Sequence, residues 1–429
     1  PLKRVASEIS PAGTFKNDAL LGAPAFDGGA GGEPVVIDIV HARQPARPAI
    51  TPTVNEAKRL LHTGDVQIGE GTRAHAFADN VPVYNVWHTL WRTQPAADYT
   101  VTRRNHFFQI DPDSPLPVFL WQIDLAMRAE LATQGFNVAM LRSGDDRLWT
   151  VRGSDGRQVS GAWEETPRSR ARSLTAPFGA GAYGAFLDSP LGGGAIFSLT
   201  DGLQASLALP TRNHLYLYLT PDAAPRTAGE KTRVELLLLG VPRMTDGTAH
   251  LPAATSEVVD RFYRDFGLDG GPTGYTVKGD AGTVTGQRYI LAIDGSKDGF
   301  SGTITGALIS SLPIAVDGLN DRWSSVLYDR ARQQARPLGT FEGRAWATVV
   351  LGGGKDLFIG QPVTADHPDL FIQLTQSGEA EWRLEVHNPT DAPITTRLRV
   401  NPHFEPLKDT PVGAAPLTIP AGSSAYRTL

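Results

Sequence analysis

The sequence predicts a mainly β protein: a large antiparallel β-sandwich with a few short helices and a small C-terminal β-sandwich. Three observations lead to this expectation. The 429 residues include 45 glycines and 32 prolines spread along the chain, as suits many short strands joined by tight turns. Short apolar runs bounded by turn residues recur over most of residues 195–429. Two segments, residues 53–64 and 257–266, have both a helix-starting residue at the N-terminal end and a helix-ending glycine at the C-terminal end.

The two helical segments are predicted from their ends. Thr53 and Glu56 have the spacing of a capping box, and Gly64 can close that helix. Ser256 is the expected N-cap of the second helix, and Gly267 its stop. Residues 119–133 fit either an alternating strand or a helix face, so periodicity leaves that segment open.

Most other segments read as hairpins. Ala195–Leu199 and Leu203–Leu209 flank an Asp201-Gly202 turn, while His214–Leu219 and Val234–Leu239 flank a polar loop. Further strands are expected at residues 275–277, 289–293, 300–308 and 345–351. We therefore expect one large antiparallel array.

The last part of the chain predicts a separate small sandwich. Strands of five to seven residues are expected at 371–375, 382–386 and 394–400, with a further short strand at 417–419. The predicted division is an N-terminal extension with one short helix (1–66), a first β-sandwich unit (67–250), a second β-rich unit packed on it (251–364) and the small sandwich (365–429).

Composition limits the partners and the chemistry. A net charge of −5 gives no basic footprint for nucleic acid, and no run of about 18 apolar residues predicts a membrane span. The absence of cysteine excludes thiol nucleophiles, disulfides and Cys-ligated metals, and it favours a secreted or periplasmic bacterial protein. Lys3 and Arg4 are followed by no apolar stretch, so no signal peptide is expected in this sequence.

A stretch rich in aromatic and polar residues is the expected sugar site. Aromatic faces take the C–H surface of a pyranose while planar polar groups fix its hydroxyls. The candidates for substrate binding are Tyr84, Trp87, Trp91, Asn105, Tyr218 and Trp323. The structural alternative is a half-buried strand whose Trp87 and Trp91 pack in the core.

Two kinds of glycan cleavage are open. A uronate lyase needs a cation against the carboxylate and a base for the C5 proton. The candidates for those roles are His88, Arg104, His106, Arg212, His214 and Tyr216. A glycoside hydrolase needs two carboxylates about 5–9.5 Å apart. Its candidates are Glu164, Glu165, Asp188, Asp321, Glu342 and Asp366, of which no spacing singles out a pair.

One loop has the residue types of a calcium site. Asp294, Ser296 and Asp298 place oxygen ligands at alternate positions before Gly299, but the acidic residue at the twelfth position of a calcium loop is missing. A plain β-turn is the alternative. No other cofactor is implied.

Two passages resemble a known group of proteins. Leu215–Leu219, the Pro221-Asp222 turn, Ala228–Lys231 and Val234–Leu239 resemble the strand, turn and strand of the supersandwich (galactose-mutarotase-like) β-sandwiches of bacterial polysaccharide lyases and glycoside hydrolases. Residues 382–429 resemble the small β-sandwich modules appended to such enzymes. The resemblance transfers no catalytic residue, and the α-helical toroid of many such lyases has no counterpart here.

Three hypotheses about function follow. The first is a carbohydrate-active enzyme, a lyase of a uronate-containing polysaccharide or oligosaccharide ahead of a hydrolase because Arg, His and Tyr cluster better than carboxylates. The second is a glycan-binding or surface protein without catalysis. The third is a structural sandwich with no small-molecule site.

Overall fold

The computed structural model describes most of the chain from residue 88 onward. The described residues are 36–38, 41–43, 88–92, 99–108, 118–127, 135–137, 139–142, 148–162, 174–187, 193–208, 216–222, 227–241, 247–308, 311–376, 381–413 and 415–429. The chain forms two compact units, which divide between Asp260 and Arg261. The helix expected at residues 53–64 lies outside the described residues. Within the part of the chain that is described, no helix is long and apolar enough to cross a membrane.

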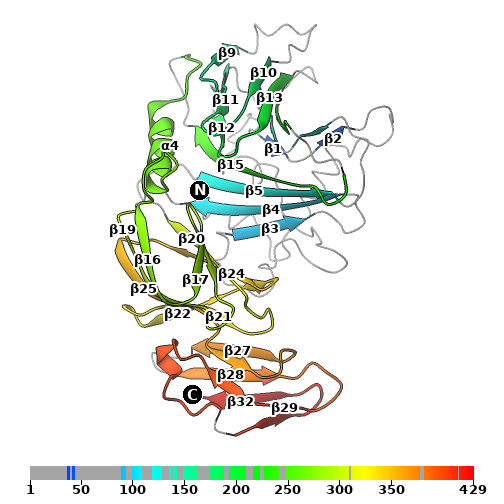
Figure 1. The fold of residues 1–429 in the computed structure, drawn as a ribbon, viewed down its shortest axis with the longest axis vertical. Coiled ribbons are helices and arrows are strands. Elements are labelled where there is room, and N and C mark those ends of the chain that lie inside the picture. The colour runs from blue at the N-terminus through cyan, green and yellow to red at the C-terminus, as the bar shows by residue number, and fades with distance from the viewer. Residues whose placement is uncertain are drawn as a thin grey trace, which may run out of the picture. The chain divides into compact units, whose positions relative to one another are not determined.

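An eight-stranded antiparallel sheet forms most of the first unit (Figure 1). Its strands, in spatial order, are β3 (His88–Arg92), β4 (Tyr99–Phe108), β5 (Val118–Met127), β15 (Lys231–Val241), β12 (Gly193–Ser198), β11 (Tyr183–Leu187), β8 (Leu148–Arg152) and β9 (Gln158–Ala162). β5 settles the open segment at residues 119–133 as a strand. Its Trp121, Ile123 and Leu125 are at most 3% exposed and alternate with half-buried Gln122 and Asp124.

A five-stranded sheet is the second layer of this unit. In spatial order it contains β1 (Val36–Asp38), β7 (Ala139–Arg142), β14 (Tyr216–Pro221), β13 (Leu203–Ala208) and β10 (Leu174–Pro177). A short antiparallel pair, β2 (His41–Arg43) with β6 (Gly135–Asn137), adds to it. The first unit is therefore a β-sandwich, as the sequence predicts.

Gly184 shows which face of the large sheet meets the other layer. A Cβ atom added to Gly184 on β11 would collide with Leu217 Cδ2 on β14, so the two strands face each other closely. Ile196 is the cross-strand partner of Gly184, and Leu238 is the partner of Ile196. Both are at most 2% exposed, and this side is called the inner face below. Residues that alternate with these positions belong to the outer face.

Two predicted hairpins are wrong. β12 and β13, which flank Asp201-Gly202, lie in different sheets, and so do β14 and β15. The reason is burial: residues 194–198 of β12 are buried without a break, as in a central strand with neighbours on both edges. β12 already pairs with β11 and β15, so the chain after the turn must enter the opposite sheet.

The second predicted helix is confirmed, although it starts earlier than expected. α4 spans Ala253–Asp265, so Ser256 lies inside the helix instead of at its N-cap. Gly267 follows with a φ of 64°, and the Leu268 amide donates to the Tyr263 carbonyl, as in a glycine-terminated helix end. Phe262, fully buried, stacks on Tyr289 with 6.1 Å between ring centroids.

Two five-stranded sheets form the first part of the second unit. One contains β16 (Tyr275–Ala281), β19 (Phe300–Gly306), β25 (Gly353–Gly360), β21 (Ser325–Asp329) and β22 (Gln334–Leu338) in spatial order. The other contains β17 (Thr283–Gln287), β18 (Leu291–Asp294), β20 (Leu312–Asp317), β24 (Arg344–Val349) and β23 (Thr340–Phe341). The expectation of a wholly antiparallel array fails in the described residues. Trp323 and Ile372 form an isolated parallel bridge, and β18 and β20 are parallel. The chain forms β19 in the other sheet between them and therefore returns in the same direction.

The small C-terminal sandwich is built from short antiparallel strands (Figure 1, orange to red). β26 (Val363–Ala365) pairs with β30 (Leu398–Val400), β27 (Phe371–Gln376) and β32 (Ser424–Thr428) flank β28 (Trp382–His387), and β29 (Ile394–Thr396) pairs with β31 (Leu417–Ile419). The strand expected at residues 394–400 is thus two strands with different partners.

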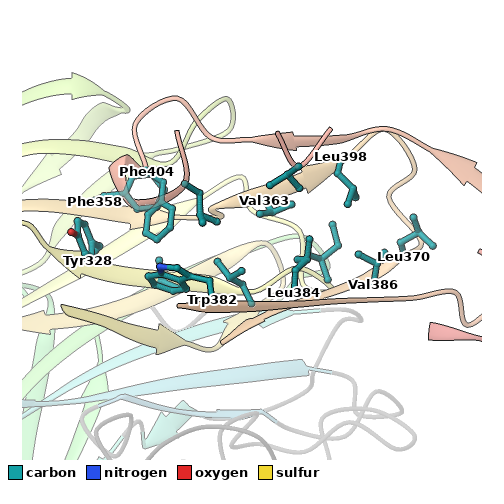
Figure 2. Close-up of a cluster of buried hydrophobic side chains, with 14 of the residues drawn as sticks. Tyr328, Phe358, Val363, Leu370, Trp382, Leu384, Val386, Leu398 and Phe404 are labelled. Carbon is teal, nitrogen blue, oxygen red and sulfur yellow. The ribbon is translucent and has the colours of Figure 1, made fainter. Parts of the chain in front are cut away.

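The core of this sandwich is continuous with the sheet before it. Figure 2 shows the rings of Tyr328, Phe358, Trp382 and Phe404 gathered at one end of the buried cluster, with aliphatic side chains such as Leu384 at the other. Phe404 meets Trp382 edge to face at 5.2 Å and Tyr328 at 5.5 Å. Since Tyr328 and Phe358 belong to β21 and β25, the small sandwich packs on that sheet.

Candidate functional site

A row of polar side chains crosses the outer face of the large sheet on β4, β5 and β15. The register places Arg104 opposite Gln122, Gln122 opposite Glu235, and Asp124 opposite Arg233. These positions alternate with the buried inner-face residues, so the side chains stand on the outer face. The polar row is defined as Arg104, His106, Gln122, Asp124, Arg233 and Glu235.

The polar row is held together by hydrogen bonds and ion pairs. Arg104 Nη1 and Arg233 Nε each lie 2.6 Å from a carboxylate oxygen of Asp124. Gln122 Nε2 donates to Glu235 Oε1 over 2.8 Å, and Gln122 Oε1 lies 3.0 Å from His106 Nε2. Because an amide oxygen can only accept, that imidazole nitrogen carries the proton.

Burial and charge determine how Asp124 titrates. Burial by itself raises the pKa of its carboxyl group, but the charge and hydrogen bonds of Arg233, together with those of Arg104, outweigh burial. The pKa of Asp124 is therefore lowered, and the carboxylate stays ionised between its two guanidinium partners. The two ion pairs of Asp124 thus connect three neighbouring strands, β4, β5 and β15.

Three of the expected catalytic residues meet at one edge of this row. His88 on β3 is the register partner of His106, and Arg104 is two residues away on the same strand. His106 is only 1% exposed, and Arg104 is bound to Asp124. The register thus places His88, Arg104 and His106 on neighbouring strands, and two of them are engaged in supporting the sheet.

The expected substrate-binding residues are dispersed. Trp91 pairs with Arg103 and Asn105 with Trp121, at positions that alternate with those of Arg104 and His106. The remaining candidates of the same stretches, Tyr84, Trp87, Arg212 and His214, lie outside the described residues.

Tyr216, Tyr218 and Trp323 lie outside the large sheet. Tyr216 and Tyr218 are on β14 of the five-stranded sheet, at positions that alternate with inward-facing Leu217. Trp323 lies in the second unit, where its Nε1 donates to the Leu370 carbonyl over 3.1 Å and its ring packs on the C-terminal core. Tyr216 and Tyr218 are therefore not on the sheet that carries the polar row.

A second polar group stands on the outer face at the opposite edge of the large sheet. Tyr183 on β11 is the cross-strand partner of Arg152 on β8, and Arg152 is the partner of Gln158 on β9. Tyr183 is adjacent to inward-facing Gly184, so all three point outward. With Thr150 and His250, they form the group that is called the Tyr183 cluster below.

Gln158 is the centre of the Tyr183 cluster. Its Nε2 lies 3.2 Å from Thr150 Oγ1 and 3.2 Å from His250 Nδ1, and its Oε1 lies 3.4 Å from the Tyr183 hydroxyl. Arg152, Gln158 and His250 are exposed and Tyr183 is half-buried. Unlike His106, these groups are therefore accessible to a large substrate.

The environment of Tyr183 favours its protonated form. Burial is the largest influence and raises the pKa of the phenol, whereas the positive charge of Arg152 and a hydrogen bond with Thr150 oppose the rise. The net pKa is above the ordinary value. Tyr183 is thus a phenol that keeps its proton at neutral pH and can donate it.

The calcium candidate folds as a turn. Asp294 Oδ1 accepts the backbone amide of Ser296 over 3.0 Å, and the Asp298 carbonyl accepts from Asn401 Nδ2 over 2.9 Å. The hydrogen bond from Ser296 lowers the pKa of Asp294, which is fully exposed. One of the side-chain oxygens expected as ligands, Asp294 Oδ1, thus closes the turn. In the described residues, no group of three or more His, Asp or Glu side chains gathers to hold a metal.

Two of the carboxylates considered for hydrolysis bind other groups of the protein, and a third lies at a turn. Asp321 accepts the Gly343 amide and Asp366 binds Arg399, while Glu342 lies at a tight turn with a φ of 51°. Residues 164, 165 and 188 lie outside the described residues.

Sequence reasoning missed the Tyr183 cluster because its members come from three strands and a loop. Gln158 and His250 are 92 residues apart in the chain, and neither lies in an aromatic-rich stretch. The available signal was the polar residues at alternate positions of β8 and β9, such as Thr150, Arg152 and Gln158. This pattern indicates a shared polar face only once the order of the strands in the sheet is known.

No model of a known protein family matches this sequence, and no curated protein matches it.

Proposed function

We propose that this protein cleaves a uronate-containing polysaccharide by β-elimination at the Tyr183 cluster. The observation that carries the proposal is the meeting of a phenol, an imidazole and a guanidinium around one amide, on an accessible sheet face. These are the group types that an elimination next to a carboxylate requires. Arg152, Gln158 and His250 are exposed at this edge of the sheet, which suits a polymer that approaches from outside.

Arg152 binds the uronate carboxylate. It is exposed, and no residue in the described part of the chain forms an ion pair with it. A guanidinium placed against the carboxylate stabilises the negative charge that develops when the C5 proton leaves. Tyr183, directly opposite Arg152 in the register, then lies beside the reacting carbon atoms.

Gln158 couples the base and the acid. When its Nε2 faces His250 Nδ1, the neutral imidazole carries its proton on Nε2 and cannot take another there. Turning the amide by 180° exchanges its oxygen and nitrogen without changing its shape. Oε1 then accepts from a protonated Nδ1, which frees Nε2 of His250 as a base, and the amide donates to the Tyr183 oxygen, which frees the phenol proton.

The reaction then follows from that one arrangement. His250 Nε2 takes the C5 proton, the electron pair forms the C4–C5 double bond, and the C4–O bond breaks. The leaving oxygen takes the proton of Tyr183. Proton exchange with water restores both side chains.

The test is product formation with uronate and neutral polysaccharides, measured as unsaturated-uronate absorbance and as reducing ends. Wild-type protein is expected to raise both with a uronate polymer. Tyr183→Phe and Arg152→Met are each expected to lower kcat/KM by about a hundredfold, in the range of a lost proton donor or charge contact. Tyr218→Phe on the other sheet and Arg157→Met in the exposed β8–β9 turn are the matched controls, which should keep wild-type activity.

Each outcome decides something. Reducing ends without absorbance would mean hydrolysis and would overturn elimination. Absorbance that survives Tyr183→Phe and Arg152→Met would place the reaction elsewhere. Silence with every polymer would refute the proposal.

A further inference from the structure

The outward side of β27, β28 and β32 carries two exposed aromatic rings. Phe371 is 44% and Tyr426 is 55% exposed, although the same three strands bury Ile372, Trp382 and Val386 on their other side. The sheet is short and regular, so both rings stand on a rigid base.

The register fixes the layout of this surface. Phe371 is opposite His387, and Gln373, Glu385 and Tyr426 form one row across the three strands. Phe371 and Tyr426 are thus two strands and two residues apart, which corresponds to about 12 Å from ordinary strand spacing and rise. That separation exceeds one pyranose ring, so the surface fits a chain and not a single sugar.

Each ring is already held in place by its neighbours. The Tyr426 hydroxyl donates to Glu385 Oε1 over 3.0 Å, and the Arg383 guanidinium lies 5.1 Å from the Tyr426 ring centre. On the other ring, the guanidinium of Arg322 lies 5.6 Å from the Phe371 centre and is paired with Asp369 over 2.7 Å. A preformed surface loses little conformational entropy when it binds a ligand.

The chemistry of this surface points to an acidic glycan. Polar side chains separate the two rings, so this is not the continuous apolar patch of a protein interface. Aromatic rings interleaved with planar carboxamide, carboxylate and guanidinium groups suit sugar C–H faces and hydroxyls. Arg383 is exposed and has no ion-pair partner in the described part of the chain, whereas Arg322 has Asp369. It is therefore available for a carboxylate of the ligand.

We propose that the face formed by Phe371, Gln373, Arg383, Glu385, His387 and Tyr426 binds an acidic polysaccharide chain independently of the Tyr183 cluster. Only the choice of a uronate polymer rests on the proposed function. The small C-terminal sandwich then holds the polymer, while the first unit performs the chemistry.

The experiment measures binding of the full chain to polygalacturonate, alginate and hydroxyethylcellulose by affinity electrophoresis and calorimetry. Phe371→Ala and Tyr426→Ala are each expected to weaken binding to the uronate polymers by about tenfold, as the loss of an aromatic anchor does. Arg383→Met should weaken binding to the two acidic polymers and leave any binding to the neutral one unchanged. All three residues are exposed, so thermal midpoints should stay at the wild-type value.

Two controls match these variants. Val350→Ala removes an apolar side chain that is 50% exposed elsewhere in the second unit, and Arg399→Met removes a 72% exposed guanidinium of the same small sandwich. Both should bind within about twofold of the wild type.

The two proposals fail separately. Binding that is absent, or that is unchanged in Phe371→Ala, Tyr426→Ala and Arg383→Met, overturns the proposed binding face. Elimination on short oligosaccharides should be unaffected by these variants, because it depends on the Tyr183 cluster. Loss of that elimination in Tyr426→Ala would also contradict the independence of the two sites.

Discussion

Removing the charge of Asp124 should destabilise the large sheet by about 2 kcal/mol. Asp124 is 30% exposed and binds Arg104, which is 18% exposed, and Arg233, which is 60% exposed. A solvent-exposed pair contributes about 0–1 kcal/mol, whereas breaking a fully buried pair costs about 3–5 kcal/mol. The contribution of the exposed Arg233 contact should be near that of a solvent-exposed pair. The contribution of the Arg104 contact should lie between those of an exposed and a buried pair. Asp124→Asn keeps the shape of the side chain and so isolates the charge.

The assay is urea unfolding followed by circular dichroism, at pH 7 and at several lower values. Asp155→Asn is the control, because this exposed carboxylate contacts only the Arg157 amide and should change stability by less than about 0.5 kcal/mol. A loss below about 0.5 kcal/mol in Asp124→Asn would refute the view that the polar row braces the sheet.

The dependence on pH follows from the lowered pKa of Asp124. A carboxyl group with a folded-state pKa below its unfolded value of about 3.9 contributes stability that is complete above that value. The contribution disappears as the pH falls through the folded-state pKa. The difference in unfolding free energy between wild type and Asp124→Asn should therefore be constant near neutrality and narrow below about pH 4. If this difference in unfolding free energy instead grew as the pH falls, the pKa of Asp124 would be raised and not lowered in the folded protein.

Three further substitutions test the packing. Gly184→Ala should cost about 1–3 kcal/mol, measured by urea unfolding, because its new methyl group would meet buried Leu217 between the sheets. Asn388→Ala should cost about 3 kcal/mol by the same assay, since this fully buried amide donates to three carbonyls and accepts from Thr390. Trp382→Ala should lower the unfolding free energy by about 3–5 kcal/mol, seen as a lower midpoint, because it opens a cavity beside Phe404.

The sequence was informative wherever a structure is local. α4 and the strands of the small C-terminal sandwich follow from capping residues, turn residues and alternation, and their positions are close to those predicted. The mainly β class follows from the same signals repeated along the chain. These features depend on residues that are neighbours in the sequence.

Local sequence signals did not predict which strands pair with each other. The turn at Asp201-Gly202 is a sound hairpin signal, yet β12 and β13 enter different sheets because β12 already has two neighbours. A turn fixes the direction of the chain, but burial on both sides of a strand decides whether the next strand can lie beside it.

The candidate site shows the same limit. Arg104, His88 and His106 come from one stretch of sequence and lie on neighbouring strands, because β3 and β4 are consecutive and pair. Tyr183, Gln158 and His250 come together through the order β11-β8-β9 and a loop, which no local pattern encodes. Tyr216 and His106 were expected to work together but belong to sequence segments that fold into separate sheets.

The most direct test of the account is the appearance of unsaturated uronate in a mixture of the full chain and uronate polysaccharides, compared between wild type and Tyr183→Phe. We predict rising absorbance with the wild-type protein and a loss of about a hundredfold in Tyr183→Phe, with Tyr218→Phe unchanged. Equal absorbance from wild type and Tyr183→Phe, or none from either, would contradict the assignment of elimination to this sheet face.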